Sequence, residues 1–436
     1  MTAESQPPPQ EPHSGHHQSL APFYIELLPK IRSLVVSILL PPAQRVAEPV
    51  VGESQITIPP ASGDPDTSGC TLDLPAAVDP ASLTVTRTPD GLSLKLGLRH
   101  SAVLPPDPSA TDPPSDVPAL ENLVSICCHA CSRNLLLPTP AGNASRFAKA
   151  VELPSEYWHE LTDCWACHTE DYSQMPGQKG GVVLAKQGVL MVGKSHVVLH
   201  PADVDFAALD VDLAESSKGV LRVGRTAPAL CSQCRTPVGD YQFDTIPTTS
   251  AAVRELVHGI KLYKYGVAFT TAASAIIPAT TSSLMDPPSS PLPPPPFRPF
   301  VTYFVDELRD STEAHAAYRF AVSEKDAEGP RLLIWVLSWN VFISSTIAAP
   351  QPTPYRTLLP AVKVLYVDFA PASGVSAPAH VKGLRTAWEH DPQVEHVSLH
   401  KSLCDEVIEA LKCSSTHLPP AQRESKGFSV GFFART

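Results

Sequence analysis

The chain has 436 residues, with 33 Lys and Arg against 44 Asp and Glu, so its formal net charge is −11 at pH 7. This excess of negative charge argues against direct binding to nucleic-acid phosphates or to anionic lipid surfaces. Proline accounts for 48 residues, and because proline breaks helices, a long helical bundle or coiled coil is excluded. The length exceeds that of one ordinary domain and predicts several compact units joined by linkers.

The chain shows no segment typical of export or membrane insertion. Residues 1–20 lack an apolar core and a basic leader, so we expect a disordered tail rather than a signal peptide. The apolar stretch Leu332–Ala349 is interrupted by Ser338 and Asn340, which favours a buried strand pair over a membrane span. We therefore expect a cytoplasmic location, with the nucleus as the alternative.

The first predicted unit, residues 21–102, is rich in short strands. Its strongest local pattern is a hairpin at Leu83–Leu98, in which Pro89-Asp90-Gly91 supplies the turn between two alternating segments. A proline-rich linker at 103–118 separates this unit from the next one.

The middle unit, residues 119–275, is also predicted to be β-rich, with one helix beginning at Ser155. Its expected strands are Leu123–Ile126, Gly188–Val192, His196–His200, Val220–Val223 and Gly259–Phe269. A second proline-rich linker follows at 276–299 and contains four consecutive prolines, which favour an extended polyproline conformation.

The C-terminal region, residues 300–436, mixes both types of element. The expected elements are a helix at Val301–Phe320, strands at Leu332–Ile343 and Ala361–Phe369, a helix at Ser402–Lys412 and a strand at Gly427–Phe433. The predicted fold class is therefore α+β and β-rich, with antiparallel sheets, zinc knuckles in the middle and a C-terminal α+β region.

Two Cys-x-x-Cys pairs, Cys128 with Cys131 and Cys231 with Cys234, carry the clearest chemical pattern. Zn²⁺ in structural sites takes four ligands in a tetrahedron, and one such turn supplies two thiolates. The two pairs together predict a closed structural zinc site that joins distant parts of the chain. The alternative is two unrelated pairs of reduced, buried cysteines.

A third group, Cys164, Cys167 and His168, offers further ligands. It predicts either a second zinc site or a replacement of one ligand of the first site by Cys167 or His168, because spacing alone does not decide among them.

Many short motifs along the chain resemble those of one known family. They are Cys128–Cys131, Leu153–Trp158, Trp165–His168, Cys231–Cys234, Tyr318–Phe320, Ile334–Trp335, Ala361–Tyr366, Trp388–Glu389, Cys404, Leu418–Arg423 and Phe428–Val430. In their order and spacing they resemble the HECT-like, ubiquitin-conjugating-enzyme-binding family of ubiquitin-protein ligases. The resemblance covers about 300 residues after Leu120. It implies an E3 ligase that binds a ubiquitin-conjugating enzyme and ubiquitin and promotes ubiquitin transfer to substrate lysines.

The resemblance makes Cys404 the candidate nucleophile for a ubiquitin thioester. Ser402-Leu-Cys-Asp405 is similar to a capping box, which would place Cys404 in the first turn of a helix, where the helix dipole lowers a thiol pKa. The alternative is packing, because Cys404, Ile408 and Leu411 recur at helical spacing and would line a buried face.

The sequence also departs from true HECT ligases. The large bilobal catalytic region is not recognisable, and their cysteine signature is absent. The alternative function is therefore a non-catalytic binding protein that stabilises or inhibits a partner, for which the endonuclease of the pre-mRNA 3′-end cleavage machinery is the predicted candidate.

Overall fold

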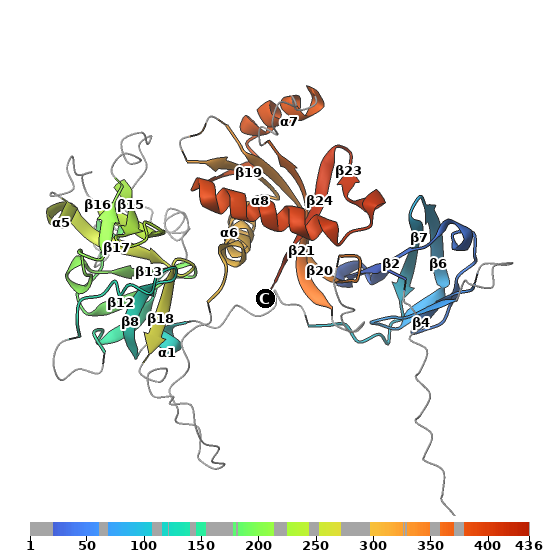
Figure 1. Cartoon of the computed structure of the whole chain (residues 1–436), viewed down its shortest axis with the longest axis horizontal. Coiled ribbons are helices and arrows are strands. Elements are labelled where there is room, and N and C mark those ends of the chain that lie inside the picture. The colour runs from blue at the N-terminus through green and yellow to red at the C-terminus, as the bar shows by residue number, and fades with distance from the viewer. Residues whose placement is uncertain are drawn as a thin grey trace, which may run out of the picture. The chain divides into compact units, whose positions relative to one another are not determined.

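The computed structural model describes residues 21–60, 69–106, 116–120, 122–139, 145–153, 178–179, 182–212, 225–243, 253–271, 297–325, 327, 329–348, 358–369 and 379–435 (Figure 1). The chain divides into two compact units. Unit 1 comprises residues 1–110, 334–367 and 409–436, and unit 2 comprises residues 111–333 and 368–408. The expected tail at 1–20, the helix beginning at Ser155, the strand at 220–223 and most of both linkers lie outside the described residues.

Unit 1 contains a sheet path with the strand order β23-β24-β21-β20-β1-β2-β7-β6, in which the neighbours β23–β24, β24–β21, β20–β1, β1–β2, β2–β7 and β7–β6 pair antiparallel. The strands are β1 (Phe23–Leu28), β2 (Ser33–Leu39), β6 (Val78–Thr88), β7 (Gly91–Leu98), β20 (Leu332–Ser345), β21 (Leu359–Asp368), β23 (Glu424–Ser425) and β24 (Phe428–Ala434). A smaller antiparallel sheet contains β3 (Val50–Val51), β4 (Gln55–Ile58) and β5 (Cys70–Asp73). Strands from both ends of the sequence thus share one sheet, which contains both β1 and β24. Tyr24–Leu27 of β1 pair with Phe342–Ser345 of β20.

The predicted hairpin is confirmed as β6 and β7. Thr88 pairs with Gly91, so Pro89 and Asp90 form a two-residue turn. The alternating leucines Leu92, Leu94 and Leu96 are almost fully buried, as a strand with one face on a core requires. Gly91 is required at its position because a Cβ atom there would lie 1.9 Å from the carbonyl oxygen of Ile38.

The stretch predicted as a buried strand pair is one long strand instead. β20 runs without interruption through Ser338 and Asn340, because paired neighbours on both sides satisfy its backbone and no turn is needed. Among the described residues, no helix is long and apolar enough to cross a membrane.

The sequence Leu-Pro-Pro-Ala-Gln-Arg occurs twice in unit 1, at 40–45 and at 418–423, and adopts the same turn both times. In each copy the arginine Nε donates to the leucine carbonyl, at 2.8 Å from Arg45 to Leu40 and at 3.0 Å from Arg423 to Leu418. Gln422 Nε2 also donates to Ser37 Oγ of β2 at 2.7 Å, so the second copy is tied to the strand that precedes the first.

Unit 2 contains a seven-stranded sheet with the order β14-β15-β16-β17-β13-β12-β9, and an antiparallel pair, β8 with β18. Its strands are β8 (Leu123–Cys128), β9 (Lys149–Glu152), β12 (Val189–Val192), β13 (His196–Leu199), β14 (Leu209–Val211), β15 (Arg225–Cys231), β16 (Pro237–Phe243), β17 (Val257–Tyr263) and β18 (Val267–Thr271). The short pair β10 (Gln178–Lys179) and β11 (Val182–Val183) and the short helices α1 (Val117–Leu120) and α5 (Val253–Leu256) complete this part. One continuous apolar core lies within it, and the predicted β-rich character is confirmed.

The remaining elements of unit 2 are α6 (Phe300–His315), β19 (Arg319–Glu324), α7 (Ala379–Glu389) and β22 (Val394–Leu399) (Figure 1). Helix α8 (Lys401–Thr416) begins in unit 2, and its residues from 409 onward belong to unit 1. β19 and β22 pair in parallel, as do β9 and β12, and the predicted fold class of antiparallel sheets did not include such pairs. The predicted helix at 301–320 was too long at its end. Ala316 adopts a left-handed conformation and its N–H donates to Thr312 O, which ends α6 and frees the following residues for β19.

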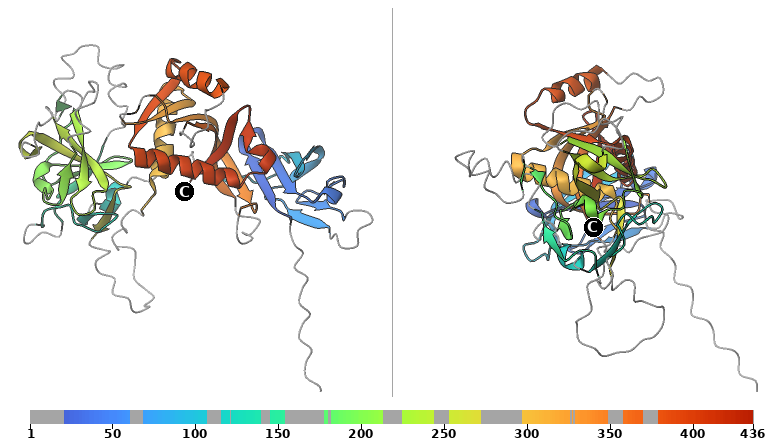
Figure 2. Two further views of the ribbon diagram at one scale, coloured as in Figure 1. Left: turned by 45° about the horizontal axis from the view of Figure 1, so that its top comes forward. Right: turned by 90° about the vertical axis from the view of Figure 1, so that its left-hand side faces the viewer.

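The last helix and strand of the chain are confirmed and pack together. The C-terminal half of α8 lies against β24, where Phe432 N donates to Ser414 Oγ at 2.9 Å (Figure 2). Gly431 permits this approach, because a Cβ atom there would meet Ser414 Oγ at 3.0 Å.

Candidate functional site

The two Cys-x-x-Cys pairs meet in unit 2. The sulfur atoms of Cys128, Cys131, Cys231 and Cys234 all lie within 4.8 Å of one another. Cys128 Sγ is 3.6 Å from Cys234 Sγ, and Cys131 Sγ is 3.5 Å from Cys231 Sγ. Each cysteine of one pair therefore has its sulfur close to a sulfur of the other pair, and the predicted convergence of distant chain segments is found.

The two pairs are held by the same backbone turn. Each follows a strand that ends at its first cysteine, β8 at Cys128 and β15 at Cys231. In the first turn Ser132 N donates to Cys128 O at 2.9 Å, and in the second Arg235 N donates to Cys231 O at 2.8 Å.

The residue after each second cysteine also has the same unusual conformation. Ser132 and Arg235 have positive φ angles of 61° and 63°. Such angles are uncommon outside glycine, and their recurrence shows that the two turns share one backbone conformation.

The four sulfurs fit a tetrahedral metal ion. A zinc ion bound about 2.3 Å from each sulfur sets neighbouring sulfurs about 3.8 Å apart, close to the two contacts above. Cys128 and Cys231 are fully buried in the core of unit 2, whereas Cys234 is exposed. The cluster can therefore hold a metal ion at the edge of this core, with four thiol ligands.

The thiols of this cluster have different pKa values because their surroundings differ. Burial raises the pKa of Cys128 to about 12. A hydrogen bond with the Thr236 hydroxyl, at 3.3 Å, lowers the pKa of Cys234 to about 6. Cys127, next to Cys128, points its sulfur to Ser125 Oγ at 3.7 Å and is not part of the cluster. Cys164, Cys167 and His168, the predicted additional ligands, lie outside the described residues.

Cys404, the predicted nucleophile, lies in the first turn of α8 and is fully buried. Burial is the main cause that raises its pKa to about 11, and the carboxylates of Glu324 and Asp405 act in the same direction. The predicted capping box does not form. The carbonyl of His400 accepts the N–H groups of Leu403 and Cys404 instead, so the helix begins before Ser402.

An ion network lies beside Cys404. Arg331 pairs with Glu324 at 3.4 Å, with Asp405 at 3.8 Å and with Asp368. Its positive charge opposes the rise in the pKa of Cys404 without overcoming burial. Cys404 is thus an enclosed thiol whose raised pKa favours the protonated form at neutral pH, and its catalytic role stays a prediction.

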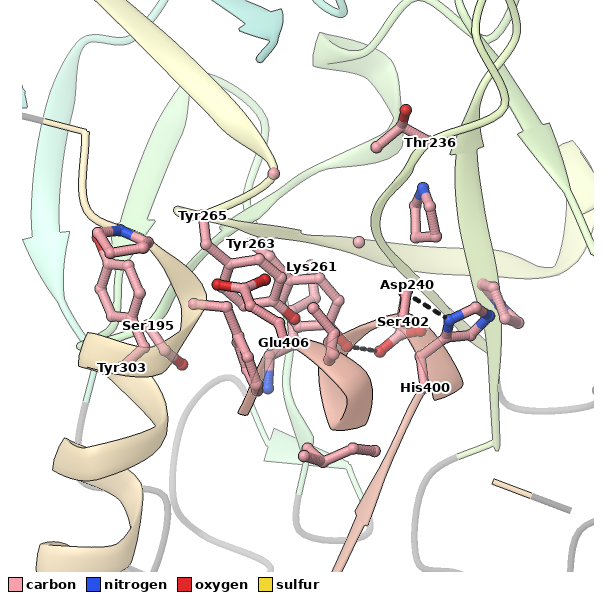
Figure 3. Close-up of a pocket in the computed structure, with 18 of the residues that line it drawn as sticks. Ser195, Thr236, Asp240, Lys261, Tyr263, Tyr265, Tyr303, His400, Ser402 and Glu406 are labelled. Atoms are coloured by element: carbon pink, nitrogen blue, oxygen red, sulfur yellow. Dashed lines mark hydrogen bonds between the residues drawn. The ribbon is translucent and has the colours of Figure 1, made fainter. Parts of the chain in front are cut away.

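A cavity of about 420 Å³ lies next to the sulfur cluster in unit 2, and sequence reasoning missed it (Figure 3). Thr236, which bonds Cys234, is part of its wall. So is Phe297, whose ring stacks on His129 of the first turn with centroids 3.6 Å apart. No pattern of residue spacing in the sequence predicts this cavity, because its walls come from strands, helices and loops that are distant in sequence.

Comparison with known proteins identifies the family. A model of the family described as HECT-like ubiquitin-conjugating enzyme (E2)-binding matches residues 26–430. A protein of Mus musculus that is named as an E3 ubiquitin-protein ligase is 21% identical over 85% of this chain and 92% of its own length. A protein of Pongo abelii with the same name is 22% identical over 70% of this chain and 71% of its own length. No solved structure matches the chain.

The chain belongs to the HECT-like E2-binding family, as its motifs predicted. It is therefore an E2-binding protein of the ubiquitin pathway.

Proposed function

We propose that this member of the E2-binding family is an E3 ubiquitin-protein ligase that docks a ubiquitin-loaded conjugating enzyme and promotes transfer of ubiquitin to a substrate lysine. The observation that carries the proposal is the family match over nearly the whole chain. The shared ligase name of the relatives supports it.

The proposed reaction breaks the thioester between ubiquitin and the cysteine of the conjugating enzyme. The lysine amine forms an amide bond with the ubiquitin carbonyl carbon and releases a proton to solvent, and the conjugating enzyme leaves as a thiolate. A two-step route through Cys404 would need this thiol to ionise and reach solvent. Its full burial and its pKa of about 11 favour the direct route, in which the ligase positions both reactants.

The conjugating enzyme needs an accessible apolar surface, and β20 of unit 1 offers one. Trp335 and Leu337 are 40% and 48% exposed, and because they are two positions apart they lie on the same face of the strand. The Trp335 ring meets Phe428 of β24 edge to face, with centroids 6.3 Å apart, so it is held in place while still exposed. We assign this surface to the conjugating enzyme because the family is defined by binding that partner.

We further propose that the four-cysteine cluster holds a structural Zn²⁺. Four thiolate ligands leave the ion no open position, so when bound it supplies a cross-link rather than a reaction centre. Cys128 and Cys131 would then be joined to Cys231 and Cys234 across unit 2. Reduced thiols of this kind persist in the cytoplasm or the nucleus, which we propose as the location of the protein.

The test combines activating enzyme, a panel of conjugating enzymes, ubiquitin and the full chain. We expect ubiquitin conjugates that Cys404→Ala leaves unchanged, as does the matched control Cys413→Ala on the exposed side of the same helix. Loss of a thiol-sensitive ubiquitin adduct in Cys404→Ala alone would instead establish the two-step route.

The docking surface is tested in the same assay. Leu337→Ala is expected to weaken conjugating-enzyme binding about tenfold. Ile31→Ala, which shortens another exposed apolar side chain, should have no effect. Absence of conjugates with every conjugating enzyme, together with tight binding to the pre-mRNA 3′-end cleavage endonuclease, would favour the non-catalytic alternative.

A further inference from the structure

We propose that the cavity of unit 2 binds a proline-rich segment of a partner protein in an extended polyproline conformation. The cavity volume of about 420 Å³ lies within the range of roughly 300–1,000 Å³ that is typical of ligand sites. The proposed ubiquitin transfer does not involve this cavity. A negative result for either proposal therefore leaves the other unaffected.

Aromatic rings dominate one wall of the cavity. Tyr265 stacks on Tyr263 with centroids 4.9 Å apart and an interplanar angle of 10°. The ring of Phe300 meets the ring of Tyr265 edge-on, with centroids 4.8 Å apart, and the centroid of Tyr303 lies 6.1 Å from that of Tyr265. Figure 3 shows Tyr263, Tyr265 and Tyr303 among the residues that line the cavity. Aromatic-lined grooves of this kind are the common recognition surface for proline rings.

Two carboxylates on this wall already accept hydrogen bonds from the protein itself. Asp240 accepts a hydrogen bond from the Tyr263 hydroxyl. Glu406 of α8 accepts hydrogen bonds from the backbone N–H groups of Phe300 and Val301, which replace the side-chain cap that α6 lacks. Both carboxylates therefore help to hold the wall of the cavity in place.

Two hydrogen-bond donors on the cavity wall, by contrast, are available to a ligand. Within the described part of the chain, the Tyr303 hydroxyl forms no hydrogen bond and the Lys325 ammonium forms no ion pair. Burial raises the pKa of Tyr303 to about 12, so its hydroxyl stays protonated and remains a donor.

The ligand that matches this wall is apolar, flat-sided and rich in acceptors. A proline-rich segment has these properties, because each proline offers a ring and a carbonyl but no N–H group. Its polyproline conformation is preformed, so little conformational entropy is lost on binding.

The probe for the test is a fluorescein-labelled decaproline peptide, titrated with the full chain and followed by fluorescence anisotropy. We expect saturable binding, and none for a Gly-Ser peptide of equal length. Tyr303→Phe removes one hydroxyl and is expected to weaken binding several-fold, as is Lys325→Ala. Tyr265→Ala is expected to weaken it about tenfold.

The matched control is Tyr318→Phe, which removes the hydroxyl of an exposed tyrosine that does not line the cavity. It should bind decaproline like the unchanged chain. Tyr303→Phe keeps the ring in its packing, so a thermal midpoint equal to that of the control separates lost recognition from lost folding.

Three outcomes would overturn the proposal. They are no decaproline binding at about 1 mM protein, equal binding of the Gly-Ser peptide, or equal affinity of Tyr303→Phe, Lys325→Ala and Tyr318→Phe. Binding that appears only after serine replaces the four prolines at 293–296 would show that the chain's own linker, not a partner, is the occupant.

Discussion

Cys404 and Cys413 lie on the same helix but differ in exposure, and their thiols therefore differ in reactivity. Cys404 is fully buried and Cys413 is exposed. Because only the thiolate is a nucleophile, both burial and a raised pKa suppress reaction at Cys404.

At pH 7.5, a pKa of about 11 leaves about one Cys404 thiol in three thousand ionised. We therefore expect iodoacetamide to label Cys413 within minutes and Cys404 only after unfolding, as measured by peptide mass spectrometry. Because the folded pKa is raised, the thiolate fraction of Cys404 rises with pH and becomes substantial only near pH 11. Labelling of both residues at equal rates in the folded chain would contradict the enclosed thiol and support a reactive Cys404.

The two cysteine turns are local elements with the same conformation, and the tertiary structure brings them together. Their hydrogen bonds and positive φ angles match, although they belong to different strands. The repeated Leu-Pro-Pro-Ala-Gln-Arg turns behave in the same way, since both fold the arginine back onto the leucine carbonyl. Local sequence thus determines each turn, and tertiary structure determines what it meets.

Metal removal tests the role of the cysteine turns. We expect one zinc ion per chain by elemental analysis, and a fall in the thermal midpoint of about 5 °C or more after chelation, since the ion joins remote strands. Cys231→Ser should lose the metal, whereas Cys127→Ala, the adjacent cysteine outside the cluster, should keep it. A chelator that leaves the midpoint unchanged would contradict a structural metal, and two zinc ions per chain would support the predicted second site at Cys164, Cys167 and His168.

At the scale of the whole molecule, both ends of the sequence build unit 1. β1 pairs with β2 on one side and with β20 on the other, so residues near 25 and near 343 are neighbours in one sheet. Neither end can complete this sheet without the other, because an unpaired strand edge leaves backbone groups unsatisfied and favours aggregation.

We therefore expect residues 300–436, expressed alone, to aggregate or to unfold without cooperativity in circular dichroism melts. Co-expression with residues 21–106 should restore a soluble complex. The matched control is residues 116–271, which keep the seven-stranded sheet and the four cysteines and should stay soluble with zinc. If residues 300–436 melt cooperatively alone, the predicted domains at 21–102 and 300–436 are independent.

The sequence by itself determined the local features of this protein. Alternating leucines and a Pro-Asp-Gly turn predicted the β6–β7 hairpin, and two Cys-x-x-Cys turns predicted the sulfur cluster. The order of short motifs predicted the family. These signals can be read from sequence because each depends on residues within a few positions of one another, or on an ordered series of such groups.

Only the tertiary structure decided the burial of Cys404, the parallel pairing of β19 with β22 and the aromatic cavity. Cys404 has the same helical spacing whether its face meets solvent or core, so packing against other elements determines its pKa. The cavity likewise depends on Tyr265 meeting Phe300 from another element, a contact that no local pattern encodes. Such properties arise from side chains brought together by folding, where burial and neighbouring charges set their chemistry.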